Sequence, residues 1–142
     1  MLRAVIDTNV MLASRRSGSP HSPNAEVVSR WTAGEFAWLV TEDILAEYAE
    51  KLLGLGILSS DAEALLARLV LWGDPVEIRF FHVRHYPSDP DDTAFLLAAL
   101  NGNATHLVTY DDDLVNVGVF YLEFATCRPL DFLAELRAVP EV

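Results

Sequence analysis

Short apolar segments of β-forming residues alternate with helical segments along the whole chain, and this alternation constrains the fold more than any other feature. Strands are predicted at residues 2–6, 36–40, 76–83, 106–110 and 121–126. Helix starts are predicted at residues that favour helix N-termini, namely Asn24, Thr41, Ser59 or Ser60, and Asp89 followed by Pro90. Strands that alternate with helices pair in parallel and are covered on both faces. We therefore predict an α/β fold, a three-layer α/β/α sandwich with a mostly parallel central sheet of about five strands.

The size of the chain fits one domain. Its 142 residues, of which 51% are hydrophobic, suffice for a core, so we expect a single domain over residues 1–142. No apolar run approaches the roughly 20 residues of a membrane span. The N-terminus becomes acidic at Asp7, too early for a signal peptide. Cys127 is the only cysteine, which excludes an intrachain disulfide and favours a cytoplasmic protein.

Four acids stand at positions that an α/β sheet would bring together. Asp7 and Asp111 each follow a predicted strand, and Glu47 lies within a predicted helix. Asp92 lies in the first turn of another helix. Because such a sheet presents ligands beyond the carboxyl ends of its strands, we expect the four acids at one edge. They would raise one another's pKa unless a cation lay between them, and Mg²⁺ or Mn²⁺ prefers such oxygen ligands.

Each acid also has a structural alternative. Asp7 could cap a helix, and Glu47 precedes Lys51 by four residues, the favoured order for a helical ion pair. Acids at a helix start interact well with the helix dipole, which could explain Asp92 and its neighbour Asp91. Asp92 is preferred as the third site acid because it lies one turn before the apolar part of its helix. Asp91 remains the rival.

Several polar residues beside these acids could support them. Asp111 is the best candidate of its acidic run because it is nearest the strand end, and Asp113 could be an additional or supporting ligand. Thr8 and Asn9 follow the first acid, and Thr109 precedes the fourth. The hydroxyls of Thr8 and Thr109 could hold a carboxylate or a metal-bound water molecule, or could simply bond to the backbone at strand ends. Asn9 adds a second polar group at the end of the first strand, which favours a site there.

The charge of the chain limits how it could bind nucleic acid. The formal net charge is −11, whereas electrostatic binding to nucleic acid needs a basic surface. Arg15 and Arg16, predicted to lie in the loop after the first helix, could contact backbone phosphates or be merely solvated. The acidic surface also suits a basic protein partner.

An ordered set of motifs over nearly the whole chain resembles the PilT N-terminus (PIN) domain. The set consists of Val5–Val10, the helical Glu47, Asp89–Asp92 before an Ala/Leu-rich helix, Val108–Leu114, and Thr126–Leu133 at the end. More narrowly, it resembles the VapC-like toxins of toxin–antitoxin systems. By position, the family's four acids fall on Asp7, Glu47, Asp92 and Asp111. Tyr110 departs from the resemblance, because many relatives have a small residue there.

The resemblance implies a metal-dependent ribonuclease. It implies Mg²⁺ or Mn²⁺ as cofactor, RNA as substrate, a homodimer, and inhibition by a small cognate antitoxin. Two alternatives remain. The first is a catalytically weak PIN-fold binding module. The second is a Mg²⁺-binding receiver domain, which would need a lysine near the last strand, whereas Lys51 is the only lysine in the chain.

Overall fold

A five-stranded parallel sheet forms the centre of the protein, in the order β3-β2-β1-β4-β5. The computed structural model describes residues 1–16, 19 and 21–138. The strands are β1 (Leu2–Ile6), β2 (Phe36–Val40), β3 (Asp74–Pro75), β4 (His106–Val108) and β5 (Ala125–Cys127). The predicted α/β fold with a parallel sheet of about five strands is confirmed.

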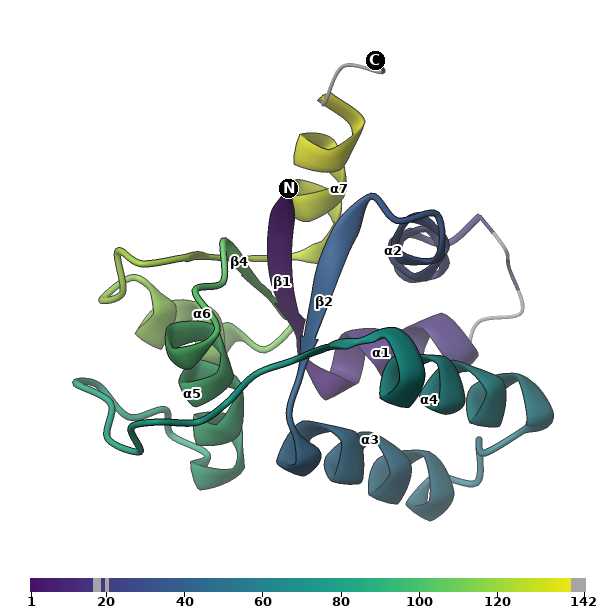
Figure 1. Cartoon of the computed structure of the whole chain (residues 1–142), viewed down its shortest axis with the longest axis horizontal. Helices are drawn as coiled ribbons and strands as arrows, with labels where there is room; N and C mark the ends of the chain where they lie inside the picture. The colour runs from purple at the N-terminus through teal and green to yellow at the C-terminus, as the bar shows by residue number, and fades with distance from the viewer. Residues whose placement is uncertain (17–18, 20, 139–142) are drawn as a thin grey trace.

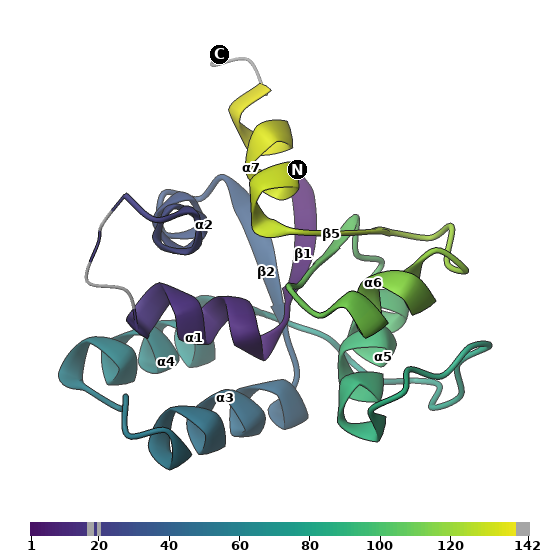
Figure 2. The ribbon, with the colours of Figure 1, turned by 180° about the vertical axis from the view of Figure 1, so that it is seen from behind.

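Helices cover the sheet on both sides. They are α1 (Thr8–Arg16), α2 (Pro23–Thr32), α3 (Glu42–Gly54), α4 (Ser60–Trp72), the 3₁₀ turn η1 (Pro90–Asp92), α5 (Thr93–Asn101), α6 (Asp112–Gly118) and α7 (Pro129–Ala138). In Figure 1, α5 and α6 lie to the left of β1 and β2, α2 and α4 lie to their right, and α3 lies below them. Figure 2 shows the same layers from behind, with α7 beside α2. Within the described ranges, no helix is long and apolar enough to span a membrane.

Local capping residues start most helices where the sequence predicted. Thr41 and Ser59 cap α3 and α4, since each side-chain oxygen accepts a hydrogen bond from a backbone amide in the first turn. The predicted cap at Asn24 is wrong. Ser22 caps α2 by accepting from the amide of Ala25, with a proline at the first helical position, so Asn24 lies inside the first turn.

The third strand predicted at residues 76–83 is wrong. Pairing with β2 is limited to Asp74–Pro75 and a hydrogen bond from the Val76 amide to the Val40 carbonyl. Beyond it, the amides of Arg79 and Phe80 donate to the side chain of Asn101 on α5 rather than to a strand. The segment crosses from the α4 side of the sheet to the α5 side (Figure 1).

Two further predictions also need correction. The fifth strand was predicted at 121–126 but spans Ala125–Cys127. Tyr121 contributes through its hydroxyl, which donates to the carbonyl of His85, instead of through strand pairing. The fourth strand was predicted at 106–110 but ends at Val108. Trp31 and Trp38 are buried in the core, whereas Trp72 at the end of α4 is 68% exposed.

The register of the central strands sets the position of the strand-end acids. Ile6 of β1 pairs with Val108 of β4, so the residues that follow these strands emerge side by side. The hydroxyl of the buried Tyr48 on α3 donates to the carbonyl of Ile6 and accepts from the indole of Trp38. This contact holds α3 against the end of β1. It thereby places Glu47, the neighbour of Tyr48, at the same edge.

Candidate active site

Asp7 is fixed between β1 and β4 by three hydrogen bonds. Its amide donates to the carbonyl of Val108 at 2.9 Å. Its Oδ1 accepts from the amide of Thr8 at 2.7 Å, and its Oδ2 accepts from the hydroxyl of Thr109 at 2.6 Å. Neither carboxylate bond comes from an amide deeper in α1, so Asp7 is oriented by the site rather than acting as an ordinary helix cap.

The surroundings of Asp7 oppose its negative charge. The residue is only 4% exposed. The pKa of Asp7 is raised from 3.8 to about 6, chiefly by burial and also by the charges of Glu47 and Asp111, against the hydrogen bonds from Thr109 and Thr8. Two other site acids are thus within electrostatic reach of this carboxylate. A cation in the same place would reverse the effect.

Glu47 joins the site through Thr8. The Thr8 hydroxyl donates to Oε2 of Glu47 at 2.7 Å, and Thr8 itself is buried. This contact connects the first turn of α1 to the middle of α3. The described hydrogen-bond partner of Glu47 is therefore Thr8, and not Lys51 on the next turn as the ion-pair alternative would require.

Asp92 is the second buried acid of the site. It is 8% exposed, and its Oδ2 is buried without a hydrogen-bond partner among the described residues. Burial, the charge of Asp7, and a hydrogen bond and charge from Asp111 raise the pKa of Asp92 to about 7. Asp91 is exposed, because the 3₁₀ turn capped by Asp89 directs the two neighbours differently. The geometry favours Asp92 over Asp91 as the third acid.

Asp111 completes the group. Its amide donates to the hydroxyl of Thr109 at 2.9 Å, and this same hydroxyl holds Asp7. Its Oδ1 accepts from the amide of Asp113 and so caps α6. Asp113 contributes this backbone contact while its side chain is exposed. Asp112 is exposed and paired with Arg128.

The donor chemistry of this group fits a hard divalent cation. All four side chains offer carboxylate oxygens, and two of the acids are buried with raised pKa values. The unpartnered Oδ2 of Asp92 is the atom that most needs a positive partner. As the side chains lie, no group of three or more His, Cys, Asp or Glu residues in the described part of the chain could hold a metal ion. The acids are thus linked in pairs rather than arranged as a ready-made metal cage.

The two predicted phosphate contacts differ from each other. Arg15 and Arg16 lie in the last turn of α1 and not in a loop, which corrects the prediction. The guanidinium of Arg15 pairs with Asp61 on α4 at 2.7 Å. Arg16 is exposed and lines a groove together with Asn9 of the first turn of α1. Arg16 is therefore the better placed of the two to meet a phosphate.

Two contacts at the site were missed by the sequence analysis. The Tyr48 hydroxyl positions α3, although the sequence indicated only an apolar helix face at this residue. The Tyr110 hydroxyl donates to Oδ1 of Asn24 at 2.9 Å, joining the end of β4 to the start of α2. In the sequence, Tyr48 is visible only as a tyrosine on an apolar helix face, and Tyr110 only as a tyrosine beside Asp111. Neither position indicates which distant residue the hydroxyl will contact.

One comparison with known families covers most of the chain. A family model described as the PIN domain matches residues 3–113, a stretch that includes all four acids. No curated protein matches the chain at a significant level.

Proposed function

The chain belongs to the PIN domain family, and we propose that it is a metal-dependent endoribonuclease that uses Mg²⁺ or Mn²⁺. PIN domains are generally nucleases that use divalent metals. One observation carries the proposal for this chain. Two carboxylates at the sheet edge, Asp7 and Asp92, have pKa values raised by burial and by neighbouring acids, and one oxygen of Asp92 lacks a partner among the described residues. A structural role alone would not require such an arrangement.

The proposed roles follow from the contacts. Asp7, Asp92 and Asp111 would hold the cation, and Thr109 would keep Asp7 and Asp111 oriented through its shared hydroxyl. Glu47 is fixed at Oε2 by Thr8, which leaves its other oxygen to orient a water molecule. When bound, a divalent ion would offset the charge of the phosphate and activate water for attack.

We further propose a cytoplasmic toxin of a toxin–antitoxin pair that acts as a homodimer. The net charge of −11 supports a basic partner such as a small antitoxin protein. Val70, Leu71 and Trp72 expose apolar surface at the end of α4, which supports association with a further protein surface. The PIN family match argues against the receiver-domain alternative.

A second candidate function is a PIN-fold binding module without turnover. It is favoured by the absence, among described residues, of a ready-made group of three metal-binding side chains. The acidic net charge also favours it, because it opposes simple RNA binding. The two candidates differ in whether Asp7 is required for chemistry.

The test is cleavage of a mixed RNA pool by the wild-type protein and by Asp7→Asn, with Mg²⁺, with Mn²⁺ and with a chelator. We expect cleavage that needs metal and falls by at least roughly 1,000-fold in Asp7→Asn. Asp131→Asn, an exposed acid on α7, serves as the matched control and should cleave normally. Circular dichroism confirms that each variant is folded.

Either of two results would contradict the proposal. Normal cleavage by a folded Asp7→Asn protein would remove Asp7 from the mechanism. No cleavage by folded wild-type protein with any metal would remove the ribonuclease and favour the binding module.

A further inference from the structure

Tyr110 is held in place from three directions beside the acids. It directly precedes Asp111, and its amide donates to Oδ1 of Asn9 at 3.3 Å. Its hydroxyl donates to Oδ1 of Asn24 at 2.9 Å, and its carbonyl accepts from Nη1 of Arg128 at 2.9 Å. Its side chain nevertheless remains 38% exposed. A fixed aromatic ring with free surface thus lies one residue from a proposed metal ligand.

The anchors of Tyr110 come from different elements. Asn9 lies in the first turn of α1 and Asn24 in the first turn of α2, where it is nearly buried. Arg128, just before α7, is in turn paired with Asp112. The contacts to Asn9 and Arg128 fix the backbone of Tyr110, and the contact to Asn24 fixes the far end of its ring. A ligand that stacks on the ring therefore loses little entropy in ordering it.

A groove between α1 and α2 shares two of its lining residues with the anchors of Tyr110. Its volume is about 420 Å³, within the roughly 300–1,000 Å³ typical of ligand pockets. It is lined by Asn9, Leu12, Ala13, Arg16, Ser22 and Asn24. Two of these residues, Asn9 and Asn24, also anchor Tyr110. The groove therefore combines apolar walls, amide groups and the exposed guanidinium of Arg16.

We propose that Tyr110 and this groove form a subsite that stacks and binds one unpaired nucleotide next to the scissile phosphate. The inference rests on the proposed ribonuclease function. The ring would stack on the base, the asparagine amides would meet its polar edge, and Arg16 would meet a phosphate. A base in a duplex is already stacked and paired, so it could not occupy this site without being extruded.

Loss of one stacked base weakens binding by roughly 10- to 100-fold, which makes the subsite measurable. The probe is a single-stranded RNA that the protein cleaves, prepared as a series with one abasic ribonucleotide at successive positions. Values of kcat and KM are measured for wild type, Tyr110→Leu and Tyr110→Phe. Binding of the same series to Asp7→Asn is followed by fluorescence anisotropy as a readout that does not need cleavage.

We expect one abasic position to raise KM about tenfold in the wild type, with kcat changed little. Tyr110→Leu should bind every RNA of the series weakly, whatever the position of the abasic nucleotide, because the ring that stacks on the base is gone. Tyr110→Phe should keep the abasic penalty, since it retains the ring. Tyr86→Leu, at an exposed tyrosine of the 76–89 segment, is the matched control and should behave as wild type.

Three outcomes would overturn the inference, and they are distinguishable from failure of the proposed function. Equal abasic penalties in wild type and Tyr110→Leu would show that the ring binds no base. Equal losses in Tyr110→Phe and Tyr110→Leu would reduce Tyr110 to a hydroxyl link between β4 and α2. Equal cleavage of a blunt duplex would show that no unpaired nucleotide needs to occupy the Tyr110 subsite. In all three cases the protein still cleaves RNA, whereas failure of the proposed function is absence of cleavage altogether.

Discussion

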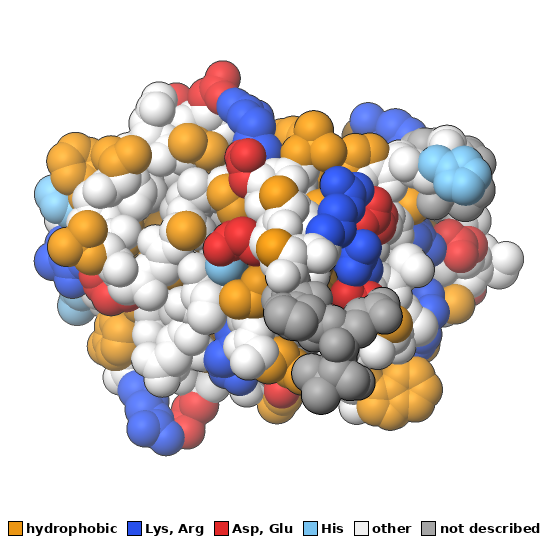
Figure 3. Space-filling view, turned by 90° about the horizontal axis from the view of Figure 1, so that it is seen from above, with side chains coloured by type: hydrophobic (Ala, Val, Ile, Leu, Met, Phe, Trp, Pro, Cys, Tyr) orange, Lys and Arg blue, Asp and Glu red, His pale blue; other side chains and the backbone are white. Residues whose placement is uncertain are grey.

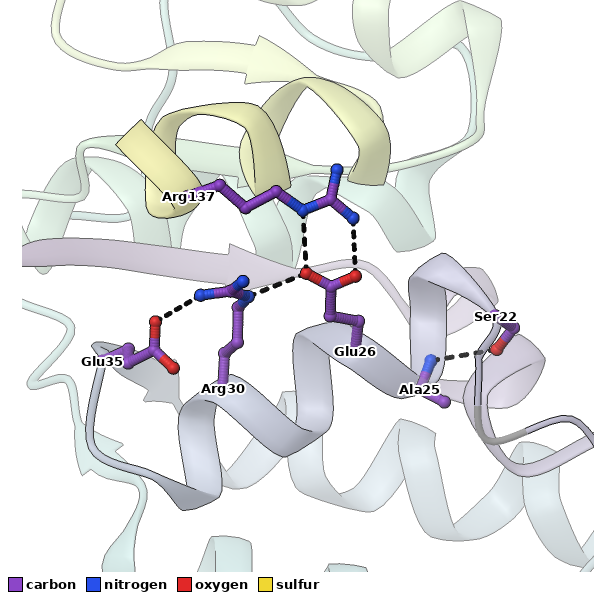
Figure 4. Close-up of polar contacts among 6 residues, drawn as sticks. All are labelled: Ser22, Ala25, Glu26, Arg30, Glu35 and Arg137. Atoms are coloured by element: carbon purple, nitrogen blue, oxygen red, sulfur yellow. Dashed lines mark hydrogen bonds and ion pairs between the residues drawn. The ribbon is translucent and has the colours of Figure 1, made fainter. Parts of the chain in front are cut away.

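Two acidic regions of the protein meet opposite surroundings. On α2, Glu26 accepts hydrogen bonds from Arg137 at 2.6 and 3.0 Å and from Arg30 at 2.8 Å (Figure 4). These two arginines lower the pKa of Glu26 to about 2. At the carboxyl edge of the sheet, burial and neighbouring acids instead raise the pKa values of Asp7 and Asp92 to about 6 and about 7. Glu26 is thus paired with arginine side chains, whereas the charged neighbours that shift the pKa values of Asp7 and Asp92 are acids.

The difference separates an acid that is paired within the fold from acids that we propose bind a cation. Seen from above, Lys or Arg side chains lie beside Asp and Glu side chains near the middle of the surface (Figure 3). Glu26 has two such positive neighbours within the protein. At the acid site, the described partners of Asp7 are a hydroxyl and an amide, and the nearest charges are negative. Under the proposed function, a divalent cation would supply the positive charge that these acids lack.

After the loss of cleavage in Asp7→Asn, the largest effect expected from this comparison is at Asp92. Asp92→Asn should lower the single-turnover cleavage rate at least roughly 100-fold, because the buried, unpartnered oxygen is lost as a ligand. Asp91→Asn changes an exposed neighbour of the same turn and should keep the rate within about twofold. The reverse ranking of the two variants would make Asp91 the third acid.

The second effect is on stability as a function of pH in metal-free protein. The pKa of Asp7 is about 6 in the folded state and 3.8 as its unperturbed value, so the folded state binds the proton more tightly. Stability is therefore lost as pH rises from about 4 to about 6, by about 3 kcal/mol from Asp7 at most. Asp92, raised to about 7, extends the loss in the same direction.

Urea unfolding at a series of pH values measures this slope. The Asp7→Asn variant should show a smaller loss of unfolding free energy over the same range, and it should be more stable than wild type near neutral pH. If the unfolding free energies of the two proteins changed in parallel with pH, ionisation of Asp7 would not destabilise the folded state. Asp7 would then not differ from Glu26 in the way proposed.

The third effect is stabilisation by Mn²⁺. The ion should offset the negative charge of Asp7 and Asp92, as the arginines offset that of Glu26. Binding to the folded state alone should stabilise the wild-type protein by about 2.7 kcal/mol at 100 times the dissociation constant. Thermal unfolding with and without Mn²⁺ measures the gain, and Asp92→Asn should show much less of it. The Glu26→Gln variant should gain as much as wild type. An equal gain in all three proteins would place the ion elsewhere.

The sequence predicted the strand-end acids because their positions depend on local patterns. Apolar strands followed by Asp7 and Asp111, and the start signal at Asp89–Pro90, specify where each acid leaves its element. The parallel sheet then places these ends together. The preference for Asp92 over Asp91 had the same local basis, since it followed from the position within the first turn.

Contacts between distant side chains and backbone could not be predicted in this way. Residues 76–83 have a β-rich composition, yet the side chain of Asn101 binds the amides of Arg79 and Phe80 and the strand ends early. The Tyr110–Asn24 contact likewise joins residues 86 positions apart. In both cases an amide side chain decides the outcome, and the sequence does not show which distant backbone or hydroxyl it will reach.

The fourth prediction concerns Thr109, which is fully buried. Its hydroxyl donates to the carboxylate of Asp7 and accepts from the backbone amide of Asp111. Thr109→Val keeps the shape but removes the donor to Asp7, so the pKa of Asp7 should rise further. We expect cleavage to fall about tenfold and the acid limb of its pH profile to move to higher pH. Thr109→Ser retains the hydroxyl and should restore both. A profile that does not move in Thr109→Val would exclude this hydroxyl from tuning Asp7.

The smallest effect should be at Glu26, although it makes more ion pairs than any site acid. Glu26→Gln breaks the contacts to Arg30 and Arg137, but these groups are partly exposed and screened by water, so about 1 kcal/mol or less should be lost. That stability is present above the unperturbed pKa of 4.5 and is lost as pH falls toward about 2, opposite in direction to the effect at Asp7. Cleavage should be unchanged. A Glu26→Gln protein that is stable but slow to cleave would mean that the α2–α7 region acts on the site, since α2 also carries Asn24, the anchor of Tyr110.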